Sequence, residues 1–150
     1  MPNSESGVKV IPHSLICFTS SGSANQMYHL GKHRFSGRGI FNSGKDVDKA
    51  IALWSEAEKL GHIEATFCLA EYYDKVVGLL NSGKDRKKAF PLYQKAADAG
   101  HIDAMYKLGC GLYEGDGIQQ NRTDGIKWLK KAAERGHERA KFFIKDEKIK

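Results

Sequence analysis

The sequence has the length and composition of one ordinary globular domain. It holds 150 residues, of which 41% are hydrophobic, 28% charged and 10% aromatic, so wholesale disorder is excluded. With 24 lysines and arginines against 18 acids, the net charge is +6, which permits an acidic partner without requiring one. No apolar run approaches the ~20 residues that span a bilayer, and Lys9, Pro12 and His13 interrupt the weak apolar stretch that could suggest a signal peptide.

The three cysteines, Cys17, Cys68 and Cys110, predict a reducing compartment. Their number is odd and no two of them have Cys-x-x-Cys spacing, so we expect no disulfide framework and a cytoplasmic protein. Cys68 and Cys110 are predicted to be small, buried or half-buried residues of helices. A reactive thiol needs a cationic neighbour, and Lys107 is near Cys110 only in sequence.

Internal repetition is the strongest signal in the sequence. The segments NQMYHLG, EATFCLA and DAMYKLG, at 25–31, 64–70 and 103–109, superimpose at a spacing of 39 residues. Gly-His pairs recur at 61–62, 100–101 and 136–137, first 39 and then 36 residues apart, because the link in the third unit is three residues shorter. Self-similarity at such a period is typical of arrays of stacked helix pairs.

In chain order, the repeat predicts an N-terminal segment, three helix pairs and a last single helix. No stretch alternates with a period of two, so we predict an all-α fold. Gly22 takes the place of Gly61 and should end a helix, while Asp46 and Asp85 lie where N-caps belong. Residues 11–21 are then either a degenerate helix or an irregular packed segment. The predicted boundaries are 1–22 for the N-terminal segment, 23–62, 63–101 and 102–137 for the three units, and 138–150 for a capping helix with a charged tail.

The pattern within each unit resembles the Sel1-like repeat, a relative of the tetratricopeptide repeat. The third unit carries it best, with Ala104, Leu108, Gly109, Gly115, Gly117, Trp128, Ala132, Ala133, Gly136 and His137 in the family's spacing. The resemblance covers about four-fifths of the chain. It implies an α/α solenoid of about three helix-turn-helix repeats plus a C-terminal capping helix, with a concave groove lined by the first helix of each repeat. It also implies a non-enzymatic adaptor that binds a protein or peptide partner.

The groove-lining residues are predicted from the positions of the first helices that remain once the core positions are removed. Tyr72 is the expected anchor, because aromatic residues dominate interface hot spots. The alternative is a solvated face that binds nothing specific. The predicted partner-binding residues are His29, Lys32, His33, Glu71, Tyr72, Lys75, Lys107 and Glu114.

Two other functions remain as alternatives. Some cysteine-rich Sel1-like proteins are linked to β-lactam hydrolysis, but they carry a cysteine pair in each repeat, which this chain lacks. The second is nucleic-acid binding by the basic end, since residues 121–150 hold ten lysines and arginines against five acids. We disfavour it because the aromatic residues there, among them Phe142, are predicted to be core.

Two motifs look like ligand sites and are interpreted otherwise. Residues 39–45 and 78–84 both read Gly-x-x-x-x-Gly-Lys, but an aspartate follows where a phosphate-binding loop needs serine or threonine, so we predict inter-helix turns. The Gly-His pairs would lie roughly 10 Å apart in a stack of helices, too far to share one metal ion. We predict that these histidines satisfy backbone groups at helix ends. His29 and His33 are one helical turn apart but lack a third ligand, so no metal and no cofactor is expected.

Overall fold

The computed structural model describes residues 13–35, 44–80 and 83–146, and over these residues it consists of helices and their connections alone. The predicted all-α fold is confirmed. The helices are α1 (His13–Phe35), α2 (Gly44–Lys59), α3 (Ile63–Leu80), α4 (Gly83–Asp98), α5 (Ile102–Glu114), α6 (Arg122–Glu134) and α7 (Glu138–Asp146). Within the described ranges, no helix has the length and apolar character needed to cross a membrane.

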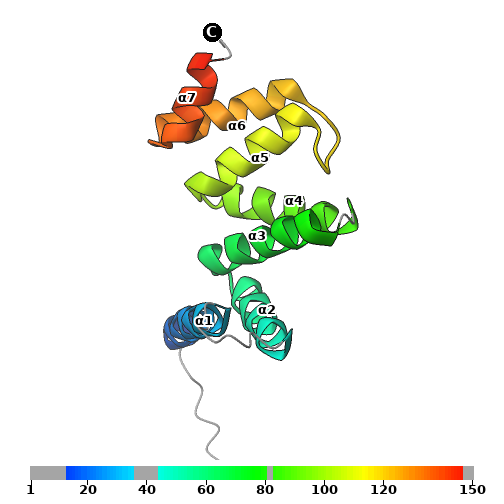
Figure 1. Cartoon of the computed structure of the whole chain (residues 1–150). Coiled ribbons are helices and arrows are strands. Elements are labelled where there is room, and N and C mark those ends of the chain that lie inside the picture. Colours follow the sequence, from blue (N-terminus) through cyan, green and yellow to red (C-terminus); the bar gives the residue numbers. More distant parts are fainter. Residues whose placement is uncertain (1–12, 36–43, 81–82, 147–150) are drawn as a thin grey trace, which may run out of the picture.

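The helices stack as three antiparallel pairs followed by a single helix. The main contacts join α1 with α2, α3 with α4, and α5 with α6, and each pair also packs on the next. Figure 1 shows this succession from α1 and α2 at one end of the molecule to α7 at the other, where α7 covers α6. The predicted solenoid of three repeats plus a capping helix is confirmed.

A Gly-His turn joins each pair to the next helix. Gly61, Gly100 and Gly136 have φ angles of 82°, 100° and 97°, a left-handed conformation that glycine adopts without steric cost. The histidine N–H that follows donates to the carbonyl five residues earlier, at 2.9, 2.9 and 3.0 Å. These bonds close the preceding helix in a Schellman motif, so the predicted C-terminal cap at Gly136 is confirmed.

Small residues allow the paired helices to approach each other. A Cβ atom added to Gly109 would lie 2.8 Å from Leu129 Cγ, and one added to Gly125 would lie 2.8 Å from the Gly109 carbonyl oxygen. Glycine is therefore required where α5 crosses α6. Many of the other buried apolar positions are alanines, as the sequence pattern predicts.

The start of the array differs from the expectation. Helix α1 continues through Gly22 without a break, because this glycine does not take the left-handed conformation that Gly61 takes. The segment from residue 13 to 21 is thus helical and continuous with the first helix of the array, and residues 1–12 lie outside the described part. Helices α2 and α4 begin at Gly44 and Gly83, so Asp46 and Asp85 lie in their first turns and are not N-caps.

Candidate functional site: a groove along the first helices

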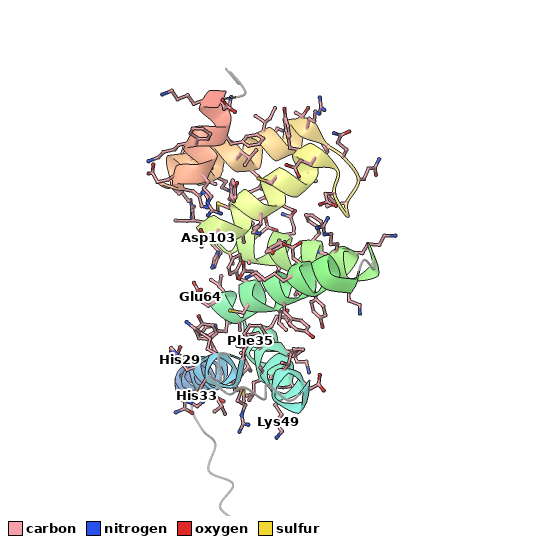
Figure 2. All side chains as sticks on the ribbon, viewed as in Figure 1. His29, His33, Phe35, Lys49, Glu64 and Asp103 are labelled. Carbon is pink, nitrogen blue, oxygen red and sulfur yellow. The ribbon has the colours of Figure 1, made fainter. Side chains whose placement is uncertain are left out.

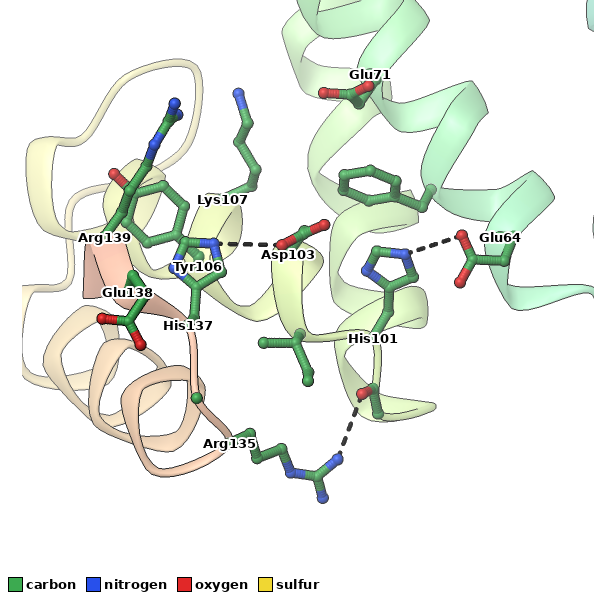
Figure 3. Close-up of a pocket in the computed structure, with 14 residues that line it drawn as sticks. Glu64, Glu71, His101, Asp103, Tyr106, Lys107, Arg135, His137, Glu138 and Arg139 are labelled. Atoms are coloured by element: carbon green, nitrogen blue, oxygen red, sulfur yellow. Dashed lines mark hydrogen bonds and ion pairs between the residues drawn. The ribbon is translucent and has the colours of Figure 1, made fainter. Parts of the chain in front are cut away.

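One face of the array is hollowed into a groove of about 940 Å³. Its lining comes from the first halves of α3 and α5, from the start of α7, and from the two Gly-His turns that precede α5 and α7. Figure 3 shows charged side chains from all three helices around it, including Glu64, Lys107 and Arg139. The groove therefore lies on the first helices of the second and third pairs and on α7, whereas α1, which the prediction includes, contributes no lining residue.

The three turn histidines cap the helices that follow them. In each turn the imidazole Nδ1 accepts a hydrogen bond from the backbone N–H three residues later. The distances are 3.2 Å from Ala65 to His62, 3.2 Å from Ala104 to His101 and 3.1 Å from Ala140 to His137. An acceptor at the N-cap satisfies one of the backbone donors that a helix start leaves free. The prediction that these histidines satisfy backbone groups is confirmed.

The same three rings stack on aromatic rings of the first helix of the unit that each turn closes, while their caps start the helix of the next unit. The ring centroids of His62 and Tyr28 are 4.8 Å apart, those of His101 and Phe67 are 4.1 Å apart, and those of His137 and Tyr106 are 4.3 Å apart, with interplanar angles of 25°, 20° and 19°. Each histidine thus joins two neighbouring units. The apolar floor of the groove at Phe67 and Tyr106 is already occupied by these rings.

The remaining ring nitrogen contacts a polar side chain on the groove wall. Because Nδ1 accepts a hydrogen bond, Nε2 carries the proton and acts as a donor. The Nε2 atoms lie 3.4 Å from Asn25 Oδ1, 3.4 Å from Glu64 Oε2 and 3.3 Å from Asp103 Oδ1 for His62, His101 and His137 respectively. Both ring nitrogens are therefore engaged. The described residues contain no group of three or more histidine, cysteine, aspartate or glutamate side chains that could hold a metal ion.

Burial lowers the pKa of His62 below its ordinary value, because desolvation disfavours the protonated ring. The neighbouring Glu64 acts in the opposite direction, and His29 acts in the same direction as burial. The neutral form is also the form that can accept the hydrogen bond of the cap. Protonation of Nδ1 would remove that acceptor.

Of the eight predicted partner-binding residues, two line the groove. These are Glu71 and Lys107. Glu71 Oε2 lies 3.2 Å from Lys75 Nζ, and Lys107 Nζ lies 3.6 Å from Asp74 Oδ2. Lys75 is an exposed neighbour of the groove, and Glu114 is exposed at the far end of α5.

The other four predicted residues lie away from this hollow. Tyr72, the expected anchor, is half-buried, with its ring 6.3 Å from that of Phe35 and 5.5 Å from that of Tyr73. His29, Lys32 and His33 are exposed on α1. Figure 2 shows His29 along the same side of the array as Glu64 and Asp103, but no residue of α1 lines the groove.

The sequence reasoning missed the residues that form most of the groove. Glu64, Asp103 and Arg139 are equivalent positions in successive units, as are Phe67, Tyr106 and Phe142. The repeat pattern predicts that the aromatic positions belong to the core, and it assigns no role to the charged positions beside them. A search for polar side chains three residues before each repeated aromatic residue would have found this wall.

The two described cysteines are free and half-buried, as predicted. Burial raises the pKa of Cys68 to about 11, with smaller contributions from Glu71 and Glu64. Burial likewise raises the pKa of Cys110. Since the thiolate is the nucleophile, these environments disfavour thiol chemistry at neutral pH.

The basic end of the chain contains an exposed aromatic ring, contrary to prediction. Phe142 on α7 is 70% exposed, although Tyr106, its equivalent in the preceding unit, is covered by His137. The expectation that the aromatic residues of this end are core is therefore wrong for Phe142. The reason is that the described chain provides no histidine turn to stack on this ring.

Comparison with known proteins identifies the array. The Sel1 repeat matches the chain at residues 27–62, 77–101 and 102–137, which together make up well over half of its length. The chain belongs to the Sel1 repeat family. A search of curated proteins found no match to this sequence.

Solved structures agree with this assignment. A Sel1 repeat protein from Oxalobacter formigenes is 26% identical with a TM-score of 0.69, and the match covers 91% of this chain and 99% of that one. The protective antigen c5321 of uropathogenic Escherichia coli, which has an SLR fold, is 26% identical with a TM-score of 0.64, over 82% of this chain and 25% of that one. Cysteine-rich protein B of Helicobacter pylori shares the fold at 20% identity and a TM-score of 0.57, over 85% of this chain and 96% of that one.

Proposed function

We propose that this Sel1 repeat chain is a protein-interaction module that binds a peptide segment of another protein in the groove. Sel1 repeat proteins are generally protein-interaction modules, and their fold is typically a non-enzymatic scaffold. The observation that supports the groove as the site is its continuity, because three first helices and two turns contribute to one open hollow. An array of this kind has few other concave surfaces.

The charge of the groove favours polar recognition. Glu64 and Asp103 retain 56% and 62% of their side-chain exposure, although each accepts a hydrogen bond from a histidine. Lys107 supplies a positive charge on the same wall. Since charges of both signs line the groove, a partner segment carrying both signs would bind in one register, and its affinity would fall with added salt.

Selection of binders from a random peptide library tests the proposal. Peptides selected on the wild-type protein should lose roughly tenfold or more in affinity for the charge-swapped variant Glu71→Lys, Lys107→Glu, whose net charge is unchanged. The matched control is Lys87→Glu, Glu134→Lys, which makes the same swap at exposed positions of the second helices α4 and α6. If the selected peptides bind both variants as they bind the wild type, the groove is not the site.

The location of the protein in a reducing compartment is also a proposal. It is supported by Cys68 and Cys110, which are free, half-buried and placed on different helices, as suits thiols with no disulfide role. Labelling of the protein's thiols directly after extraction under acid-quenched conditions would test it. Recovery of oxidised cysteines would contradict it.

A further inference from the structure

Three successive positions along the groove share one arrangement. The ring of the histidine from the following turn stacks on an aromatic ring, and the side chain three residues before the aromatic residue accepts a hydrogen bond from the histidine Nε2–H. The aromatic residues are Tyr28, Phe67 and Tyr106, and the acceptors are Asn25, Glu64 and Asp103. Each position thus presents a flat apolar surface beside a hydrogen-bond acceptor.

The fourth equivalent position, on α7, also has an aromatic residue, but a hydrogen-bond donor takes the place of the neighbouring acceptor. Phe142 follows Tyr106 by the same 36 residues that separate Ala140 from Ala104, and the side chain three residues before Phe142 is Arg139. A donor with a permanent positive charge has replaced an acceptor. The structure records no ion pair of Arg139 among the described residues. The group that complements this position is therefore an apolar side chain next to an acceptor, not a second histidine.

The packing of another helix on α7 does not account for the exposed ring. Lys141 and Lys145 occupy the positions that correspond to Met105 and Gly109 in α5. Met105 is 1% exposed, and Gly109 is the point at which α6 crosses α5 without room for a Cβ atom. A helix packed on α7 as α6 packs on α5 would meet two charged lysines. These two packing positions have thus become charged, while the aromatic position on the groove side has remained aromatic.

The surroundings of Phe142 form a hollow of about 530 Å³ that continues from the groove. Tyr106 and Arg139 line both this hollow and the groove, so the two hollows form one continuous surface. Phe143 and Asp146 line only the hollow around Phe142. Glu138, which also lines both, pairs with Lys141 at 2.8 Å. Figure 3 shows the side chains of Lys107 and Arg139 extending in the same direction beside Tyr106, so two cations face the same part of the groove.

We propose that this C-terminal end of the groove binds a partner segment that places an apolar side chain on the Phe142 ring and a carboxylate against Arg139. The inference rests on the proposed function and specifies the chemistry of the partner at one position. Stacking on an exposed aromatic ring and a charge-assisted bond to a guanidinium are both short-range and geometrically specific.

A single carboxylate fits this site better than a polyanion does. Glu138 and Asp146 lie in the same hollow as Phe142, and they would repel the phosphates of a nucleic-acid strand on either side of a stacked base. A peptide can bring one carboxylate to the Arg139 side alone. Charge complementarity therefore favours an acidic peptide over RNA or DNA.

The test is an NMR titration of the ¹⁵N-labelled full chain with synthetic peptides. The probes are 12-residue peptides of glycine and serine that carry one phenylalanine and one glutamate, separated by zero to three residues. We expect at least one spacing to bind and to shift the signals of α5 and α7. Replacing its phenylalanine by alanine or its glutamate by glutamine should weaken binding about fivefold. No binding by any spacing, or binding that is indifferent to the glutamate, would overturn the proposal.

Variants of the protein provide the matched controls. Phe142→Ala and Arg139→Glu should each weaken the best peptide about fivefold, whereas Lys87→Glu, an equal charge change on α4, should leave it unchanged. A peptide with lysine in place of glutamate should in turn bind Arg139→Glu better than it binds the wild type. Because Phe142 and Arg139 are exposed, both variants should keep the wild-type circular dichroism spectrum. If Arg139→Glu still prefers the glutamate peptide, the assignment of the carboxylate to Arg139 is wrong.

Two further measurements separate the other possible occupants. Tight, Phe142-dependent binding of a 12-nucleotide deoxythymidine strand at ~50 mM salt would identify a nucleic-acid site and overturn the peptide proposal. A sedimentation coefficient that depends on concentration for the wild type but not for Phe142→Ala would identify a second copy as the occupant. We expect neither result.

The outcomes for the two proposals are distinguishable. Library-selected peptides that respond to the Glu71 and Lys107 swap but not to Phe142→Ala would uphold the groove function and overturn this inference. Conversely, if selection yields no groove-dependent peptide, the proposed function fails, and the direct titration still decides whether Phe142 and Arg139 bind a carboxylate-bearing peptide.

Discussion

At the scale of single residues, the glycine and the histidine of each Gly-His turn stabilise the array in different ways. The glycine closes one helix through its left-handed backbone, and the histidine starts the next helix by accepting a backbone hydrogen bond at Nδ1. The same ring stacks on an aromatic residue of the first helix of the unit that the turn closes, and its Nε2 donates to a polar side chain of that helix. The recurrence of this pair in the sequence follows from a structural role that needs both residues together.

Removal of one such histidine should destabilise the array. For His101→Ala, we expect the free energy of unfolding to fall by about 2 kcal/mol, because the variant loses both the helix cap and the ring contact with Phe67. Urea denaturation followed by circular dichroism measures this change.

Asparagine at the same position separates the two contributions. His101→Asn keeps a good N-cap but loses the stacked ring, so its free energy of unfolding should lie between those of the wild type and His101→Ala. Equal destabilisation by both substitutions would mean that the cap contributes little.

Stability should decrease in mild acid through His62. Burial lowers the pKa of this histidine in the folded chain below its value of about 6.5 in the unfolded chain. The unfolded state therefore binds more protons between the two pKa values, and the contribution of the neutral ring is complete above pH 6.5 and declines as the pH falls below it. His62→Asn cannot titrate, so the stability difference between wild type and variant should shrink from pH 7.5 to pH 5. A difference that grows in acid would contradict the direction of the pKa shift.

At the scale of helices, close crossings decide which positions must lack a side chain. Gly125 and Gly109 face each other where α6 crosses α5, and a Cβ atom on Gly125 would lie 2.8 Å from both the Gly109 carbonyl oxygen and the Tyr113 backbone nitrogen. Backbone atoms cannot give way as the end of a flexible side chain can. The crossing therefore fixes the distance between the two helices of the third pair.

Gly125→Ala should accordingly lower the free energy of unfolding by about 2 kcal/mol, because α5 and α6 must move apart. The same substitution at Gly22 is the control, since nothing lies within 4 Å of its added Cβ atom. Gly22→Ala should stabilise α1 by about 0.5–1 kcal/mol, because alanine favours a helix interior over glycine. Thermal and urea unfolding of the two variants should change in opposite directions, and parallel destabilisation would contradict the crossing argument.

At the scale of the whole molecule, the core consists of two clusters of buried residues. One cluster joins α1, α2 and the start of α3 around Trp54, and the other extends from α3 to α7 around Leu108 and Leu129. Tyr73 and Leu92 pack against both clusters. Because a solenoid unit contacts only its neighbours, these two side chains carry much of the coupling between its ends.

Leu92→Ala should weaken this coupling. We expect amide protons of α2 to exchange with solvent faster in this variant while those of α5 and α6 retain most of their protection, because the two clusters can then open separately. Hydrogen exchange resolved by NMR measures both. Leu108→Ala serves as the control, since Leu108 belongs to one cluster alone. It should instead lower protection in α5 and α6, and a uniform loss in both variants would show a single cooperative core.

The all-α fold, the three helix pairs, the capping helix and the Gly-His turns could be predicted from the amino-acid sequence alone. These features depend on local chemistry, such as the left-handed glycine and the small residues at crossings, which repeats at a fixed spacing and can be compared between units. The position of the groove on the first helices also followed from the repeat. Of the predicted groove residues, Glu71 and Lys107 line it, because the face of a helix can be deduced from its periodicity.

Which aromatic rings are covered depends on the packing of the folded chain and could not be predicted from the repeat. Tyr28, Phe67 and Tyr106 are covered by histidines 31 to 34 residues later in the chain, whereas no such histidine covers Phe142 in the described residues. The sequence gives all four the same repeat position and therefore suggests one environment for them. Burial, however, depends on what packs against a residue and not on the residue itself, and for this reason Phe142 is exposed among the described residues while its equivalents are covered.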